Sequence, residues 1–196
     1  MVKYKELDFK PVVHHSNFRF DVKHKLISEL VRGDDVIDLG CGWYTNPYLK
    51  GAVGVDLETI TKPNNYKEMI TADLNGRIPV SDNSYDTVIA SGVIEHLYNY
   101  HGFLMECKRI LRKNGILIID TANRIPNRMI AKKNMLHILE WSYSEFIDLL
   151  EHFFVFQKSY GLMFTIPIIR ININLKKFPR LSNEVIYVCK NEIDIV

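Results

Sequence analysis

The chain has 196 residues, of which 47% are hydrophobic and 24% are charged, and this is enough to form one hydrophobic core. Its 25 Lys and Arg residues against 23 Asp and Glu residues leave a net charge of +2, which by itself favours neither a nucleic acid nor an anionic membrane as partner. The three cysteines contain no Cys-x-x-Cys pair, and no apolar leader or membrane-spanning run occurs. These features predict one cytoplasmic domain with reduced thiols.

Short apolar runs alternate with segments of helical period, which is typical of an α/β fold with a parallel sheet. The runs are nearly all apolar, as strands buried on both faces should be. They lie at 36–39, 52–55, 68–71, 87–91 and 116–121. We therefore predict one domain over 21–192, preceded by an N-terminal arm at 1–20.

Two helices are indicated in the second half of the chain. Apolar residues recur at helical spacing over 103–111, and Asn114-Gly115 is typical of a helix end. The spacing of Ser142 and Glu145 is that of a capping box ahead of a second amphipathic segment. A helix is therefore predicted to end at Asn114-Gly115, and another to begin after Ser142.

The last two predicted strands, 154–160 and 185–189, have no helical pattern between them. Without a crossover helix, two strands pair most simply in the antiparallel sense. We expect an antiparallel pair at the end of the sheet, with an inserted segment at 161–183.

A strand leads directly into Gly40 and Gly42, which permit a tight turn and the close approach of a ligand to backbone amides. Asp56 ends the next strand, so its carboxylate is predicted to lie where nucleotide ligands bind in α/β folds. Each feature alone is more typical of a simple turn or a solvated strand end. Together, on successive strands, they favour a nucleotide-containing cofactor, while Thr45 replaces the third glycine that a dinucleotide site would need.

Asp38-Leu39-Gly40-Cys41-Gly42 resembles the first motif of the class I S-adenosylmethionine-dependent methyltransferases, which is acid-x-Gly-x-Gly. Further motifs follow in the family's order. Ala72-Asp73-Leu74 resembles the acidic third motif, 83–89 the fourth strand, 91–97 the Glu-His-Leu signature after it, and 110–115 the turn before strand five. The likeness is to the small single-domain, type 11-like members and extends over roughly 22–191.

This resemblance implies a Rossmann-like, doubly wound sheet of seven strands in the order 3-2-1-4-5-7-6, with strand 7 antiparallel, and S-adenosylmethionine as cofactor. It also implies a set of cofactor-binding residues. These are Asp38 at the amino group, Gly40 and Gly42 at the methionine part, Asp56 at the ribose hydroxyls, Leu57 and Asp73 with Leu74 at the adenine, and Ser91 at the end of the fourth strand.

The sequence departs from the family pattern after the glycine loop. Only 43–50 remain for the first crossover helix, which predicts one of about one or two turns. Trp43 and Tyr44 fit a wall of the cofactor site or plain core packing equally well. The stretch 59–66 likewise leaves little room for a second crossover helix.

Methyl transfer from a sulfonium is an in-line displacement, so positioning supplies much of the rate and a general base is optional. His96 and His101 follow the fourth predicted strand and are the candidates for such a base. His96 belongs to a signature shared by relatives with many substrates, which favours an architectural role. His101 precedes Gly102 near a predicted helix start, a position more typical of a solvated histidine.

Motifs that are missing from the sequence narrow the range of expected methyl acceptors. No Asn/Asp-Pro-Pro-Tyr/Phe follows strand four and no cysteine ends strand four or five, which argues against the DNA amino and pyrimidine-carbon methylases. Metal-dependent catechol-type enzymes carry an acid at the end of strand four and an Asp-Asn pair after strand five. Here Ser91 and Asp120-Thr121-Ala122-Asn123 occupy those places, so no required metal is predicted. We expect a small or medium-sized acceptor methylated at oxygen or nitrogen rather than carbon.

Two segments, 124–133 and 170–180, each carry four basic residues and no acid. Both fit a solvated face or a negatively charged acceptor, whereas the lack of interleaved aromatic residues argues against RNA. The apolar and basic insertion also fits, more weakly, a membrane surface or a lipid-linked acceptor. Two other functions remain open: a non-catalytic S-adenosylmethionine-binding protein and a nicotinamide-dependent Rossmann enzyme.

Overall fold

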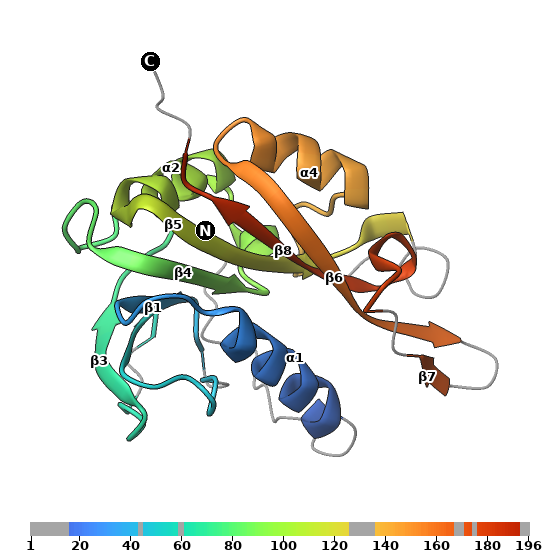
Figure 1. The fold of residues 1–196 in the computed structure, drawn as a ribbon, viewed down its shortest axis with the longest axis horizontal. Coiled ribbons are helices and arrows are strands. Elements are labelled where there is room, and N and C mark those ends of the chain that lie inside the picture. Colours follow the sequence, from blue (N-terminus) through green and yellow to red (C-terminus); the bar gives the residue numbers. More distant parts are fainter. Residues whose placement is uncertain are drawn as a thin grey trace.

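The protein is described by a computed structural model over residues 16–42, 45–58, 61–125, 136–166, 171–173 and 176–192. Its centre is one mixed sheet with the strand order β3-β2-β1-β4-β5-β8-β6-β7 (Figure 1). The predicted seven-strand order is confirmed, because β8 and β6 occupy the places of the predicted strands 7 and 6. A short additional strand, β7, lies beside β6 at the outer edge.

Five strands pair in parallel, as predicted, but the edge strand at 66–71 is not apolar, because Lys67 and Glu68 in it are exposed. The five are β1 (Val36–Leu39), β2 (Ala52–Asp56), β3 (Tyr66–Thr71), β4 (Tyr85–Ser91) and β5 (Leu111–Ala122). The strand β8 (Glu184–Lys190) runs antiparallel to both β5 and β6, so the predicted antiparallel pair is confirmed.

The predicted first residue of the insertion at 161–183 lies too early in the chain. Strand β6 (Val155–Ile166) does not end at residue 160 but remains paired with β8 as far as Met163. Beyond that point, Phe164 to Ile166 pair with β7 (Ile171–Ile173). Residues 161–166 therefore belong to the sheet, because their backbone pairs first with β8 and then with β7. The sequence alone does not reveal this pairing.

Helices cover both faces of the sheet. The helices α2 (Tyr100–Ile110) and α4 (Tyr143–Glu151) lie on one face and α1 (Ser16–Leu30) lies on the other (Figure 1). Alternate residues of the central strands therefore point into two separate apolar clusters. The larger cluster includes Phe103 and Leu104 of α2 with Phe146 and Leu150 of α4, and the smaller includes Leu26 and Ile27 of α1.

Three helix boundaries can be compared with the sequence. The capping box is confirmed, since Glu145 N donates to Ser142 Oγ (3.4 Å) and Ser142 N to Glu145 Oε2 (2.7 Å). The helix predicted to reach Asn114-Gly115 instead ends at Ile110, because buried Leu111 is already extended and pairs with Tyr85. Helix α1 includes the end of the predicted arm 1–20, whose residues before Ser16 lie outside the described part.

The one- or two-turn helix predicted over 43–50 is wrong in its described part, because residues 45–50 form turns. Asparagine amides hold this segment in place of helical hydrogen bonds. Asn46 Nδ2 donates to His24 O (2.9 Å), and Asn65 Nδ2 donates to Asn46 O (2.9 Å) and Leu49 O (3.0 Å). Trp43 and Tyr44 lie outside the described residues.

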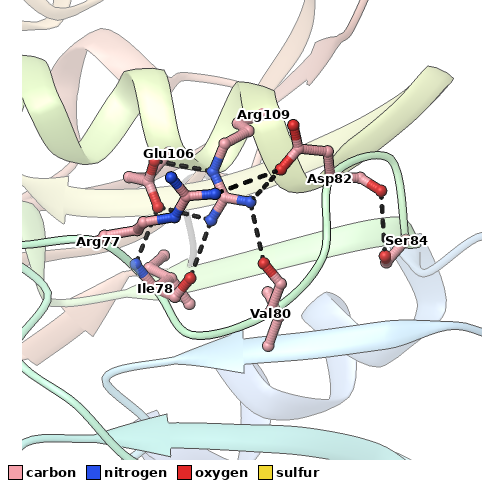
Figure 2. Close-up of polar contacts among 7 residues, drawn as sticks. All are labelled: Arg77, Ile78, Val80, Asp82, Ser84, Glu106 and Arg109. Atoms are coloured by element: carbon pink, nitrogen blue, oxygen red, sulfur yellow. Dashed lines mark hydrogen bonds and ion pairs between the residues drawn. The ribbon is translucent and has the colours of Figure 1, made fainter.

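The link from β3 to β4 is fixed by Arg109 of α2 (Figure 2). Its guanidinium donates to the carbonyls of Ile78 and Val80, each at 2.9 Å, and pairs with Glu106 at 2.7 Å. Glu106 also accepts a hydrogen bond from Ile78 N at 2.8 Å. These contacts anchor an irregular segment to α2 and so position the start of β4 without a helix.

Two short 3₁₀ helices complete the described elements. The first, η2 (Ile94–His96), follows β4 directly, and the second, η3 (Pro179–Leu181), precedes β8. Among the described residues, no helix combines the length and apolar character needed to cross a bilayer.

Candidate functional site

A cavity of about 490 Å³ lies at the carboxyl ends of β1 and β4 and is closed on one side by α1. This volume is in the range typical of small-molecule and cofactor sites, and the place in the sheet is where α/β folds bind ligands. Its lining residues are Phe20, Lys23, His24, Ile27, Asp38, Gly40, Cys41, Gly42, Asn46, Ile89, Ser91, Gly92, Glu95, His96 and Glu184.

The glycine loop after β1 needs glycine at both positions, for different reasons. Gly40 and Gly42 have φ values of +70° and +53°, which L side chains rarely adopt. A Cβ on Gly40 would lie 2.1 Å from Cγ2 of Val93, so Gly40 is required for packing. Around a Cβ on Gly42 the nearest atoms would be 3.9 Å away, so there the missing side chain leaves space on the cavity wall.

Asp56, at the end of β2, is hydrogen-bonded to this loop. Its Oδ2 accepts from Gly42 N at 2.8 Å and its Oδ1 accepts from Glu58 N at 3.1 Å. A carboxylate has about four acceptor positions, so two remain for other donors. Two vicinal hydroxyl groups of a ribose would match them.

Asp38, in β1, is buried on the cavity wall. Tyr66 Oη donates to its Oδ2 at 2.6 Å. Burial raises the pKa of Asp38 to about 6, although the Tyr66 hydrogen bond and the charge of Lys23 both lower it. The carboxylate is therefore charged at neutral pH, where it can pair with a cationic amino group.

A buried ion cluster joins α1 to the sheet beside the cavity. Lys23 Nζ lies 2.9 Å from Glu184 Oε1 and 3.4 Å from Asp120 Oδ1, and all three side chains are nearly inaccessible to solvent. Burial raises the pKa of Asp120 to about 7, while the charge of Lys23 and a hydrogen bond from Ser91 lower it. The cluster connects α1, β5, β8 and the end of β4.

Glu95 and His96, in η2, form another part of the wall. Glu95 is buried, its Oε2 accepts from Thr121 Oγ1 at 3.1 Å, and burial raises its pKa. His96 Nδ1 lies 3.1 Å from the Leu136 carbonyl oxygen. His101 is not part of the lining, because it lies exposed on α2 with its ring against Tyr100 and Phe153.

The structure brings only some of the predicted cofactor residues to the cavity. Asp38, Gly40, Gly42 and Ser91 line it, and Asp56 is bonded to Gly42. Leu57, which is 62% exposed, and Asp73 and Leu74 are not among the lining residues. Asp73 Oδ1 accepts hydrogen bonds from Asn75, and Leu74 packs in the larger apolar cluster.

Several polar lining residues were not expected from the sequence: Lys23, His24, Asn46, Glu95 and Glu184. For Asn46, the only sequence feature that could have indicated a place in the cavity wall is its position after the glycine loop. For Glu95, such a feature was its position next to His96 in the signature motif. Cys41 also lines the cavity, but burial raises the pKa of its thiol to about 12, so it is a poor nucleophile.

The basic segments do not reach the cavity in their described residues. Of 124–133, Arg124 is described, and it pairs with Glu145 of α4 at 2.5 Å. Of 170–180, Lys176 lies over the ring of Tyr160 and Arg180 over the ring of Tyr143, each at 5.5 Å. Arg128, Lys132, Lys133 and Arg170 lie outside the described residues.

The segment that forms much of this site is similar to known methyltransferases. Residues 37–119, which contain the glycine loop, Asp56 and η2, match the family model described as a methyltransferase domain. A protein of Mycolicibacterium smegmatis, named a probable S-adenosylmethionine-dependent methyltransferase, is 30% identical over 145 residues, or 68% of this chain and 56% of its own.

Two further proteins similar to this chain have descriptions that state a reaction. A ubiquinone biosynthesis O-methyltransferase of Glaesserella parasuis is 30% identical over 79 residues, which are 40% of this chain and 31% of the other. A Thermotoga maritima structure, described as an S-adenosylmethionine-dependent methyltransferase and possible histamine N-methyltransferase, has a TM-score of 0.70 at 17% identity, covering 88% and 89% of the two chains. At that identity the likeness shows the fold alone.

This chain spans about half the length of the curated relatives it matches. The matched segment nevertheless contains the ordered motifs around the cavity, and the strand order is that of the family. Residues 37–119 therefore match the type 11 methyltransferase domain, and the similarities of the chain are to class I S-adenosylmethionine-dependent methyltransferases, whose cofactor is S-adenosylmethionine.

Proposed function

We propose that this protein transfers the methyl group of S-adenosylmethionine to a small or medium-sized acceptor, at oxygen or nitrogen rather than carbon. One observation carries the proposal. The cavity combines a glycine loop with Asp38 on its wall and with Asp56 bonded to that loop, at the ends of adjacent parallel strands. The similarity to a ubiquinone biosynthesis O-methyltransferase supports oxygen as one possible acceptor atom.

The residues present fit the cofactor. Asp38 would pair with its amino group, Asp56 would accept hydrogen bonds from the ribose hydroxyls, and Gly42 leaves the space that a Cβ would fill. The bound cofactor supplies an electrophilic methyl group on a sulfonium. The protein's part is to hold the acceptor in line with that group and, through α1 and η2, to exclude water.

His96 is the candidate base for an acceptor that loses a proton, since it lines the cavity while His101 does not. The lining contains the acids Asp38, Glu95 and Glu184 against Lys23, which does not by itself favour an anionic acceptor. An anionic or lipid-linked acceptor stays a prediction based on the two basic segments. Cytoplasmic location also stays a prediction of the sequence.

Replacing Asp56 with Ala is expected to weaken S-adenosylmethionine binding by about 1 to 3 kcal/mol, because the ribose hydroxyls lose their acceptor. Asp56→Asn, which keeps one acceptor oxygen, should lose less. Calorimetric titration of the two variants and the parent measures both values. Unchanged affinity in Asp56→Ala would show that this carboxylate only fixes the glycine loop.

Cofactor affinity should also depend on pH through Asp38. The folded carboxyl has a pKa of about 6, so below about pH 6 its protonation removes the charge that pairs with the amino group. Affinity should then fall by roughly tenfold per pH unit. His24 does not contribute there, since burial lowers its pKa to about 4. Titration between about pH 5 and pH 8 checks this, and a profile for Asp38→Asn as steep as the parent's would refute it.

Turnover is the direct test of the enzymatic proposal. The protein is incubated with methyl-labelled S-adenosylmethionine and with low-mass extract fractions that carry hydroxyl or amine acceptors. Formation of S-adenosylhomocysteine together with a labelled product is expected. Tight cofactor binding without turnover of any fraction would favour the non-catalytic alternative.

A further inference from the structure

Three side chains outside the cofactor loop form a compact cluster: Glu95 and His96 of η2, and His137 from the segment before α4. Each offers one ligand atom, and these atoms all lie within 4.8 Å of one another. The two imidazole rings meet nearly edge to face, with centroids 5.0 Å apart. Two histidines and one carboxylate are a frequent ligand set for a divalent transition metal.

Both histidine rings are oriented by acceptors at their Nδ1 atoms. His96 Nδ1 lies 3.1 Å from the Leu136 carbonyl oxygen, and His137 Nδ1 lies 2.9 Å from Glu140 Oε1. Metal-binding histidines usually donate one ring N–H to a carbonyl or a carboxylate and coordinate through the other nitrogen. With Nδ1 engaged in both rings, Nε2 would be the coordinating atom.

The spacing is close to that of a bound ion. Three atoms at most 4.8 Å apart have a common centre about 2.8 Å or less from each, against typical ligand bonds of about 2.0 to 2.2 Å. Shifts of under about 1 Å in each side chain would close the site. A cation would also compensate the charge of Glu95, which is only 5% exposed.

We propose that Glu95, His96 and His137 bind one divalent first-row transition cation, such as Zn²⁺ or Co²⁺. Imidazole ligands favour these ions over Mg²⁺ and Ca²⁺, and three protein ligands leave at least one coordination position open. Because Glu95 and His96 line the cavity, that position would face the cavity. If the proposed function holds, an acceptor oxygen bound there would ionise more readily, so the cation would replace His96 as the group that promotes loss of the acceptor's proton.

This site differs from the positions on which the sequence prediction of no required metal was based, namely Ser91 and 120–123. Glu95 and His96 are adjacent in the sequence, but His137 follows only after a further 40 residues. The chain has seven histidines and no motif that links His137 to the Glu-His pair. The ligand set therefore becomes visible only in the folded chain.

The test uses the full chain, freed of metal with a chelator and titrated with Co²⁺ while its visible absorption is followed. Zn²⁺ and Mg²⁺ serve as competitors. We expect one Co²⁺ per chain, displaced by Zn²⁺ and not by an equal concentration of Mg²⁺. Glu140→Gln should weaken binding by about 10- to 100-fold, because it removes the carboxylate that orients His137.

His137→Gln should abolish the Co²⁺ spectrum, whereas His101→Gln, a change of an exposed histidine outside the cluster, should leave it unchanged. Circular dichroism confirms that each variant is folded. Absence of saturable binding to the parent chain, or equal binding by His137→Gln, would overturn the proposal. S-adenosylmethionine affinity is measured on the same samples, so cofactor binding without metal binding would reject this inference alone.

Discussion

Replacing Gly40 with alanine is expected to destabilise the protein by about 2 to 5 kcal/mol. Two costs add up at this position. The backbone has φ +70°, which costs a residue with a Cβ about 1 to 2 kcal/mol, and the new methyl group would lie 2.1 Å from Cγ2 of buried Val93. Overpacking of that kind typically costs a further 1 to 3 kcal/mol or so. Chemical denaturation measures the change.

Gly92→Ala is the matched control. Gly92 lines the same cavity and has φ +64°, but a Cβ there would have no atom within 4 Å. Its expected cost is the backbone cost alone, about 1 to 2 kcal/mol. Equal destabilisation in the two variants would show that the contact with Val93 relaxes and that Gly40 is needed only for its backbone conformation.

Replacing Lys23 with methionine should be the second large effect, a loss of about 3 to 5 kcal/mol at neutral pH. The change keeps an unbranched apolar stem up to the ε position but leaves the buried carboxylates of Asp120 and Glu184 without their cation. Lys25→Met, at an exposed position on the same helix, is the control and should cost little. Denaturation of both variants against the parent gives the two values.

The cost of Lys23→Met should depend on pH. The pKa of folded Asp120, about 7, lies above its unfolded value of about 3.8, so its contribution to stability is full below about pH 4 and is lost as the pH rises to about 7. At about pH 5 the buried carboxyl group of Asp120 is protonated and uncharged, so the loss of the positive charge of Lys23 destabilises the protein less. The loss should therefore be smaller at pH 5 than at pH 8. A loss independent of pH, or equal to that of Lys25→Met, would refute the ion cluster's role.

The central strands of this fold were predictable because most of their residues are buried. The sequences at 36–39 and 116–121 are apolar enough to identify central strands, and the antiparallel end followed from the missing helical pattern before β8. Helix α4 was predictable because its capping box is local in sequence. Such signals need no knowledge of distant residues.

Helix α1 was missed for the opposite reason. Its inner face contains the charged Lys23 beside Leu26 and Ile27, which interrupts the apolar stripe that identifies a helix. Lys23 is tolerated there because its partners, Asp120 and Glu184, come from strands 97 and 161 residues later. The glycine loop and Asp56 could be predicted because they form a local sequence motif. The cavity wall formed by α1 could not, because it depends on the pairs that Lys23 makes with Asp120 and Glu184.

Calorimetric titration of the purified protein with S-adenosylmethionine and S-adenosylhomocysteine, with NAD as a control, tests the central claim most directly. The geometry of Asp38, Gly42 and Asp56 predicts saturable binding of both sulfur compounds at one site per chain. Thr45, in place of the third glycine of a dinucleotide site, predicts no response to NAD. NAD binding more tightly than S-adenosylmethionine, or no binding of either sulfur compound, would contradict the proposed function.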